Sequence, residues 1–166
     1  GADLILTSAN NFYEGVTQKE VEEYFAAIKN PDDPTPVSYG LNTKVTKVDG
    51  KVVELPYKVG GLYSPAIERI VENLEKAKAY AETPLQAASI AELIRYYRTG
   101  DLRAFDSYSI MWTQDTTPTV DFVNGFIESY GDPLGMTGSW ESIVNYKNHK
   151  ASHRTEVISN GAQWFE

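Results

Sequence analysis

Apolar side chains recur every three or four residues in several stretches of the chain, which is the spacing of a helix with one buried face. The first such stretch begins after Thr17, which forms a capping-box pattern with Glu20 at a predicted helix start. It stops at Asn30-Pro31, because the residue before a proline is pushed out of the helical region. The pattern predicts one short amphipathic helix between these points.

Two longer helices are predicted in the middle of the chain. Ser64 is expected to be the N-cap of the first, with Pro65 in its first turn and an end at about Glu82. The second is expected to start from a capping box at Thr83 and to end at Gly100. Since the link between them is short, we expect the two helices to be antiparallel neighbours.

The segments Asn42–Val48 and Lys51–Tyr57 are rich in β-branched residues and are separated by Asp49-Gly50. Asp-Gly is a preferred pair for a type I′ turn, so this region predicts a β-hairpin. Further helices are predicted for Asp101–Gln114 and for Ala151–Phe165.

A second pair of strands is predicted near the C-terminal end. Thr119–Tyr130 has strand-like composition that Gly125 is expected to break, and Gly131-Asp132-Pro133 predicts a turn after it. Trp140–Tyr146 is expected to return as the second strand. The expected fold class is α+β, predominantly helical with a β-hairpin and additional short strands, in a single domain formed by residues 1–166.

Composition is typical of a globular domain, with 42% hydrophobic and 23% charged residues among 166. The net charge of -8 argues against a nucleic-acid partner, because it repels phosphate backbones. No apolar run approaches the length of roughly 20 residues that a membrane span requires, so no membrane partner is expected. The chain contains no cysteine, which leaves its localisation unknown, with the cytoplasm slightly favoured.

Several sequence segments resemble the dipeptidyl peptidase III family of zinc metallopeptidases. The strongest similarity is the run Gly125-Phe126-Ile127-Glu128-Ser129-Tyr130-Gly131-Asp132-Pro133-Leu134-Gly135, followed by Gly138-Ser139-Trp140-Glu141. Upstream, Trp112-Thr113-Gln114-Asp115 precedes that run by the same number of residues as in the family, and Val71–Ala81 is similar to a long helix of the family. The similarity extends more weakly from about Asn10 to the C-terminus.

The resemblance implies a two-lobed aminopeptidase that removes dipeptides from the free N-terminus of short peptides, using a zinc-bound water activated by a glutamate. The family's zinc ligands come from a hexapeptide with the pattern His-Glu-x-x-Gly-His and from a distant Glu-rich motif, and this sequence contains neither. The chain ends at Trp164-Phe165-Glu166 without a polar tail, so we expect it to be a fragment of the lobe that lacks zinc. The implied partners are a short peptide substrate and the missing zinc-bearing lobe of the same chain. No cofactor is expected in this fragment, and it is expected to be inactive alone.

The residues of the predicted second hairpin are the candidates for a functional site. Strand alternation predicts that Phe126, Glu128 and Tyr130 share one face, while Ile127 and Ser129 point to the other. Without the resemblance, Glu128 is best explained as a solvated strand residue, and Tyr130 as a surface residue whose ring covers apolar groups while its hydroxyl faces water.

The resemblance implies specific roles for five residues. Glu128 and Glu141 hold the protonated N-terminal ammonium of the substrate, and a hydrogen bond to a charged group contributes about 1.5–3 kcal/mol. Tyr130 is the candidate catalytic residue, since its hydroxyl would donate to the scissile carbonyl as negative charge develops there. Ser129 would add backbone contacts to an extended peptide, and Trp112 would pack against substrate side chains or serve only in the core.

His149 and His153 are separated by the spacing that places two metal ligands on one helix face. The residues between them lack the glutamate of the zinc-protease pattern, and no third ligand is indicated. Two exposed histidines of a helix are the better interpretation, so no metal ligands are assigned.

Two other functions stay open from the residues alone. Glu128 and Glu141 are also compatible with an acid and base pair for glycoside cleavage, which needs carboxylates about 5–10 Å apart. The chain is equally compatible with a standalone, non-catalytic module that binds peptides. The coding sequence after Glu166 distinguishes the module from the peptidase. A stop codon favours the module, and a His-Glu-x-x-Gly-His motif favours the peptidase.

Overall fold

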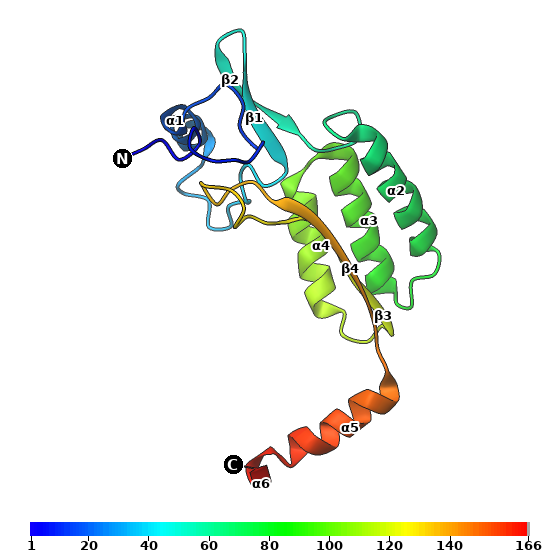
Figure 1. Cartoon of the computed structure of the whole chain (residues 1–166). Coiled ribbons are helices and arrows are strands. Elements are labelled where there is room, and N and C mark those ends of the chain that lie inside the picture. Colours follow the sequence, from blue (N-terminus) through cyan, green and yellow to red (C-terminus); the bar gives the residue numbers. More distant parts are fainter. Residues whose placement is uncertain (166) are drawn as a thin grey trace.

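The computed structural model describes residues 1–165 of the chain and confirms an α+β fold in which helices predominate (Figure 1). Within these residues the elements follow in the order α1 (Gln18–Ile28), β1 (Thr43–Val48), β2 (Lys51–Pro56), α2 (Ser64–Lys78), α3 (Pro84–Thr99), α4 (Leu102–Gln114), β3 (Val120–Glu128), β4 (Ser139–Tyr146), α5 (His149–Asn160) and α6 (Ala162–Phe165).

The N-terminal part consists of α1 and the first hairpin. The predicted capping box of α1 is present, because the Thr17 side chain accepts from the backbone of Glu20 and the Glu20 carboxylate accepts from the Thr17 N–H at 2.9 Å. β1 and β2 pair antiparallel, and their connecting residues Asp49 and Gly50 have φ angles of 51° and 76°. Both residues of a type I′ turn require positive φ, which confirms the predicted hairpin turn.

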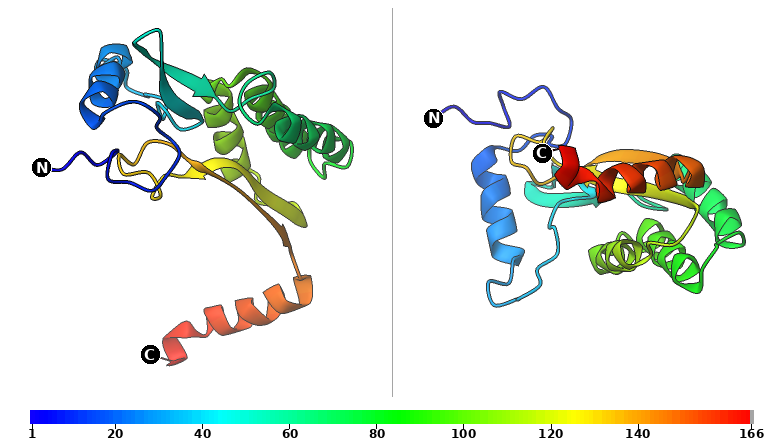
Figure 2. Two further views of the ribbon diagram at one scale, coloured as in Figure 1. Left: turned by 45° about the horizontal axis from the view of Figure 1, so that its top comes forward. Right: turned by 90° about the horizontal axis from the view of Figure 1, so that it is seen from below.

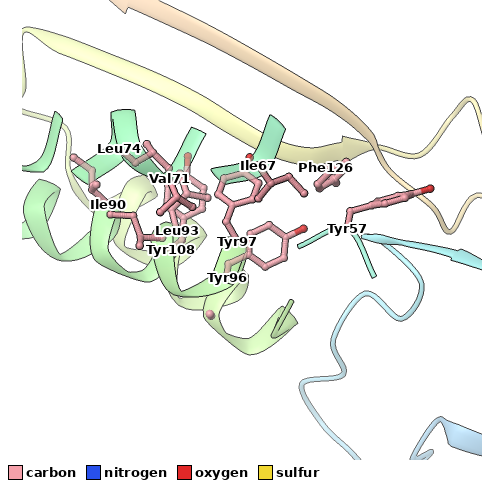
Figure 3. Packing of buried hydrophobic residues seen from close by; sticks show 12 residues of the cluster. Tyr57, Ile67, Val71, Leu74, Ile90, Leu93, Tyr96, Tyr97, Tyr108 and Phe126 are labelled. Carbon is pink, nitrogen blue, oxygen red and sulfur yellow. The ribbon is translucent and has the colours of Figure 1, made fainter. Parts of the chain in front are cut away.

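The helices α2, α3 and α4 lie side by side with α3 in the middle, and β3 and β4 lie across this layer (Figure 1). The main hydrophobic core is enclosed between the helices and β3 (Figure 3). It contains aliphatic and aromatic side chains that are all at least 90% buried, namely Tyr57, Ile67, Val71, Leu74, Ile90, Leu93, Ile94, Tyr96, Tyr97, Ala104, Tyr108 and Phe126. Burial of this core fixes the surface on which the second hairpin rests.

Both ends of α2 differ from the prediction. Tyr63 is the N-cap, in a left-handed conformation, and Ser64 is the first helical residue. The Ser64 hydroxyl accepts from the Gly60 N–H at 2.6 Å and donates to Glu68, so it does not cap the helix. The helix ends at Lys78 and not near Glu82: residues 79–81 continue as tighter turns, and the Glu82 carboxylate accepts from two backbone N–H groups at the start of β3.

Gly125 does not break the second hairpin, contrary to the prediction. β3 runs unbroken from Val120 to Glu128 and pairs antiparallel with β4. A Cβ atom at Gly125 would lie 2.8 Å from the ring of Phe105, so the glycine allows α4 to pack closely on the strand. Here the glycine serves helix packing rather than a turn.

The chain has a second, smaller core in its N-terminal part, built from Ile5, Tyr13, Val16, Val21, Phe25 and Val45. At the other end, α5 and α6 extend away from the rest of the molecule (Figure 2). Across residues 1–165, the structure contains no helix that combines the length and the apolar character needed to cross a bilayer.

Candidate functional site

A β-bulge at the end of β3 decides which face of the second hairpin each side chain takes. Phe126 pairs with Trp140, but Glu128 pairs with Ser139, so Ile127 is an extra residue on its strand. Cross-strand partners share a face and consecutive residues alternate. Glu128 therefore shares the face of Ser139, and the predicted shared face of Phe126 and Glu128 is wrong.

The same bulge brings Glu128 and Glu141 onto one face. Glu141 is two residues beyond Ser139 on β4 and pairs with Gly125. Glu128 and Glu141 are therefore diagonal neighbours, and such positions lie roughly 7–8 Å apart in an antiparallel pair. Both side chains are half-buried. Two adjacent carboxylates on a partly exposed strand face favour a cationic group placed between them.

Ser129 and Tyr130 follow directly after the end of β3. The Ser129 carbonyl accepts from the Asp132 N–H at 3.0 Å, which closes a turn with Tyr130 as its second residue. Ser129 is half-buried, whereas the Tyr130 side chain is 87% exposed. The phenol of Tyr130 thus projects from the turn into solvent, next to the strand end that carries Glu128.

Trp112 lies at the opposite end of the hairpin. Its indole N–H donates to Asp121 Oδ1 at 2.8 Å, and its ring packs against the main core. Asp121 is near the start of β3 and Glu128 is its last residue, a separation of about 20 Å at the usual rise of about 3.3 Å per residue. Trp112 lines a separate groove of about 480 Å³ together with Pro118 and Lys147. The structure does not bring it together with the other four candidates.

A polar network that is buried at Tyr97 and Asn124 connects the hairpin to α3. The Tyr97 hydroxyl accepts from the Trp140 indole N–H at 2.9 Å and donates to the Asn124 side-chain oxygen. The Asn124 amide in turn donates to Ser142 at 3.1 Å. Burial raises the pKa of Tyr97, so the phenol stays protonated as a donor. This network was not predicted from the sequence, because Tyr97 looks like one more apolar residue of its helix.

Asp132 was predicted only as a turn residue, but in the structure its carboxylate also accepts several hydrogen bonds. Its carboxylate accepts hydrogen bonds from the Tyr13 hydroxyl and from three backbone N–H groups of residues 134–137. Burial, with the hydrogen bond to Asp132 as the second cause, raises the pKa of Tyr13. The sequence offers little sign of this contact, since Tyr13 and Asp132 are 119 positions apart.

The described residues do not fit a zinc site. Among residues 1–165, no group of three or more His, Cys, Asp or Glu side chains is arranged to hold a metal ion. His149 and His153 lie exposed on α5, and His153 is 3.6 Å from the Glu156 carboxylate. We therefore assign no metal ligand within the part of the chain that the structure describes.

Comparison with known proteins gives consistent matches. The sequence matches the model of peptidase family M49 over residues 12–165. It is 38% identical over 109 residues to human dipeptidyl peptidase 3, a match that covers 65% of this chain and 15% of the human protein. It is 29% identical over 117 residues to dipeptidyl peptidase 3 of Dictyostelium discoideum, covering 70% of this chain and 16% of that protein.

Solved structures share the fold. The structure of dipeptidyl peptidase III from Caldithrix abyssi matches with a TM-score of 0.68 at 22% identity, over 94% of this chain and 29% of that one. The enzyme structure from Corallococcus sp. strain EGB matches with a TM-score of 0.67 at 20% identity, over 94% of this chain and 28% of that one. The chain therefore spans less than a third of the length of the proteins that it resembles.

Proposed function

The chain belongs to peptidase family M49, and from this membership we propose that it is part of a zinc-dependent dipeptidyl peptidase that releases N-terminal dipeptides from short peptides. Its part is to bind and position the substrate. The main support from the geometry is that Glu128 and Glu141 are diagonal neighbours on one face of the hairpin. Membership of a peptidase family argues against the glycosidase alternative for this pair.

Glu128 and Glu141 bind the free ammonium group of the substrate. An N-terminal amine is largely protonated near neutral pH, and hydrogen bonds to charged groups are about twice as strong as neutral ones. Anchoring the ammonium at a fixed distance from the cleaved bond determines that the product is a dipeptide. Ser129, at the end of the same strand, contributes backbone contacts to the extended peptide.

Tyr130 stabilises the transition state. Its phenol donates a hydrogen bond to the carbonyl oxygen of the scissile bond as negative charge develops on that oxygen. The exposed position of the side chain, beside the strand end that carries Glu128, leaves the hydroxyl accessible to a bound peptide. Trp112 has a place in this proposal only as a contact for a more distant part of the substrate, because it lies at the other end of the hairpin.

Zinc in the full-length enzyme is held by residues outside this chain. The zinc supplies the attacking water of a metallopeptidase, while the residues of this chain bind and orient the peptide. In this division of roles, the residues of this chain contribute substrate contacts and no metal ligand. The alternative of a standalone peptide-binding module is distinguished by the coding sequence that follows Glu166.

The proposal is tested by Tyr130→Phe in the full-length protein. Removal of one donor to a developing oxyanion lowers kcat by about 10²–10³-fold, while KM changes little because the ground state does not depend on this bond. Steady-state kinetics with a dipeptide-releasing substrate measure both constants. A raised KM with an unchanged kcat would show that Tyr130 binds the substrate and does not act on the transition state.

A further inference from the structure

Asp132 is a buried carboxylate held by uncharged donors. Its side chain is only 5% exposed. Oδ2 accepts from the Tyr13 hydroxyl at 2.7 Å and from the N–H groups of Met136 and Thr137 at 2.9 and 2.7 Å. Oδ1 accepts from the Leu134 N–H at 3.0 Å. Four donors to one carboxylate offset the cost of burying its charge and fix its orientation.

The donors to Asp132 fold the connection between β3 and β4 into a compact loop. The Asp132 N–H also closes the turn onto the Ser129 carbonyl at 3.0 Å, and its own carbonyl accepts from Gly135 at 2.9 Å. Tyr130 is the second residue of that turn, so its backbone position depends on the same loop. The exposed Tyr130 side chain obtains little support from packing.

Tyr13 connects this loop to a rigid part of the molecule. Its ring is buried in the N-terminal core, and its backbone forms a bridge with Val45 of β1. The neighbouring residues continue the pairing, since Phe12 accepts from the Val45 N–H at 2.9 Å and Glu14 donates to the Val45 carbonyl at 3.0 Å. The loop is thus fixed from outside the hairpin as well as from within it.

We propose that Asp132 is a positioning residue for catalysis, which holds the Ser129–Asp132 turn so that the Tyr130 hydroxyl meets the reacting carbonyl. The inference rests on the role of Tyr130 in the proposed function. Asp132 does not touch the substrate and acts only through the turn. Because a displacement of about 1 Å of a catalytic group can cost about 10²-fold in rate, the precision of this turn determines turnover.

The test is a double-mutant cycle between Asp132→Asn and Tyr130→Phe in the full-length protein. An asparagine offers one acceptor oxygen in place of two, so part of the donor set loses its partner. Asp132→Asn is expected to lower kcat by about 10- to 100-fold with a smaller change in KM. In the Tyr130→Phe background the same change is expected to alter kcat by less than about twofold, because no hydroxyl remains to be placed.

Asp3→Asn is the matched control. The Asp3 carboxylate also accepts from three backbone N–H groups, those of Ile5, Leu6 and Gln18, at 2.9–3.0 Å, but it lies in the N-terminal turn, outside the hairpin. The control is expected to leave kcat unchanged in both backgrounds. Thermal unfolding of every variant shows whether the fold persists.

The outcomes separate this inference from the proposed function. Equal kcat losses from Asp132→Asn in both backgrounds, or no loss in either, overturn the positioning role while leaving Tyr130 intact. A Tyr130→Phe protein with the parent kcat overturns the proposed transition-state role of Tyr130 and this inference together. If Asp132→Asn does not fold, Tyr13→Phe decides in its place: a kcat loss that vanishes in the Tyr130→Phe background supports the proposal, and an unchanged kcat overturns it.

Discussion

Single residues of this chain acquire their proposed roles from their neighbours. Glu128 and Glu141 are separated by thirteen positions in sequence, yet their strand pairing sets them diagonally across one face. Tyr130 depends in the same way on a turn that Asp132 closes. At this scale we propose a site for a cation beside a phenol, on a hairpin that the Tyr97 hydroxyl connects to α3.

The cation site predicts the behaviour of two conservative variants. Glu128→Gln or Glu141→Gln in the full-length protein removes one charge from the ammonium site and is expected to raise KM about tenfold or more, since a hydrogen bond to a charged group is worth about 1.5–3 kcal/mol. Steady-state kinetics on a peptide with a free N-terminus measure this change.

An N-acetylated peptide is the control for that measurement. It lacks the cation, so the parent protein and both glutamine variants are expected to hydrolyse it equally poorly. Equal KM values of parent and variants on the free peptide would remove the two glutamates from the ammonium site.

At the scale of the elements, the bulge at Ile127 determines the site. If Ile127 instead paired with Ser139 in regular alternation, Glu128 would return to the face of Phe126, away from Glu141. The hairpin itself is held independently by the network of Tyr97 and Trp140. The bulge and the Tyr97–Trp140 network can therefore be changed separately by substitution.

Deletion of Ile127 tests the bulge. The deletion is expected to keep the strand pair and to leave Glu128 opposite Ser139, on the face of Glu141, while it removes the bend and the extra twist that the bulge gives to β3. We expect at least about a 10²-fold loss of kcat/KM in the full-length protein, because the carboxylate and the phenol lose their placement relative to the peptide. Circular dichroism reports whether the fold is retained.

Ile127→Ala is the matched variant, since it preserves the number of residues in the bulge. It is expected to retain most of the activity, because the backbone register is unchanged. If the deletion variant folds and hydrolyses peptides as well as Ile127→Ala does, the bulge of β3 has no part in substrate binding.

At the scale of the molecule, the proposal assigns substrate binding to this chain and turnover to the full-length protein. The purified chain of residues 1–166 with added zinc is expected to release no dipeptide, because its described residues hold no group suited to the metal. The assay compares it with the full-length protein under identical conditions. Zinc-dependent release by the chain at a rate near that of the full-length protein would contradict the proposal.

Buried tyrosines predict how the stability of the chain changes at alkaline pH. Burial raises the pKa of Tyr57 and of Tyr108 from the ordinary 10.0 to about 12. Between pH 10 and 12 the unfolded chain loses these protons and the folded chain keeps them, so the stability falls as pH rises. The loss at pH 11 is about 1.4 kcal/mol for each tyrosine.

Urea unfolding of the chain between pH 8 and 11 measures this loss. The variant Tyr57→Phe cannot ionise at that position, so its unfolding free energy is expected to fall less steeply above pH 10 than that of the parent. Identical slopes for the two proteins would show that Tyr57 does not contribute to the alkaline transition.

Much of the fold was predictable from local signals. Capping residues at Thr17, the Asp49-Gly50 turn and the apolar stripes of the helices act over a few positions, and the structure confirms them. Some local predictions were wrong. The Ser64 hydroxyl hydrogen-bonds to Gly60 and Glu68 and does not cap α2, which ends before the predicted residue, and Gly125 accommodates the ring of the distant Phe105. Family membership was also predictable, since it rests on the order and spacing of residues.

The sequence alone determined the element types and the α+β class, because these depend on side-chain chemistry and on contacts within a few positions, and its resemblance to a family named the candidate site residues. Only the tertiary structure decided which of these residues meet. The bulge at Ile127 set Glu128 beside Glu141, and packing of α4 took Trp112 to the far end of the hairpin. Likewise, Tyr13 reaches Asp132 across 119 positions, and a contact of that range follows from packing of the whole chain and not from any local pattern.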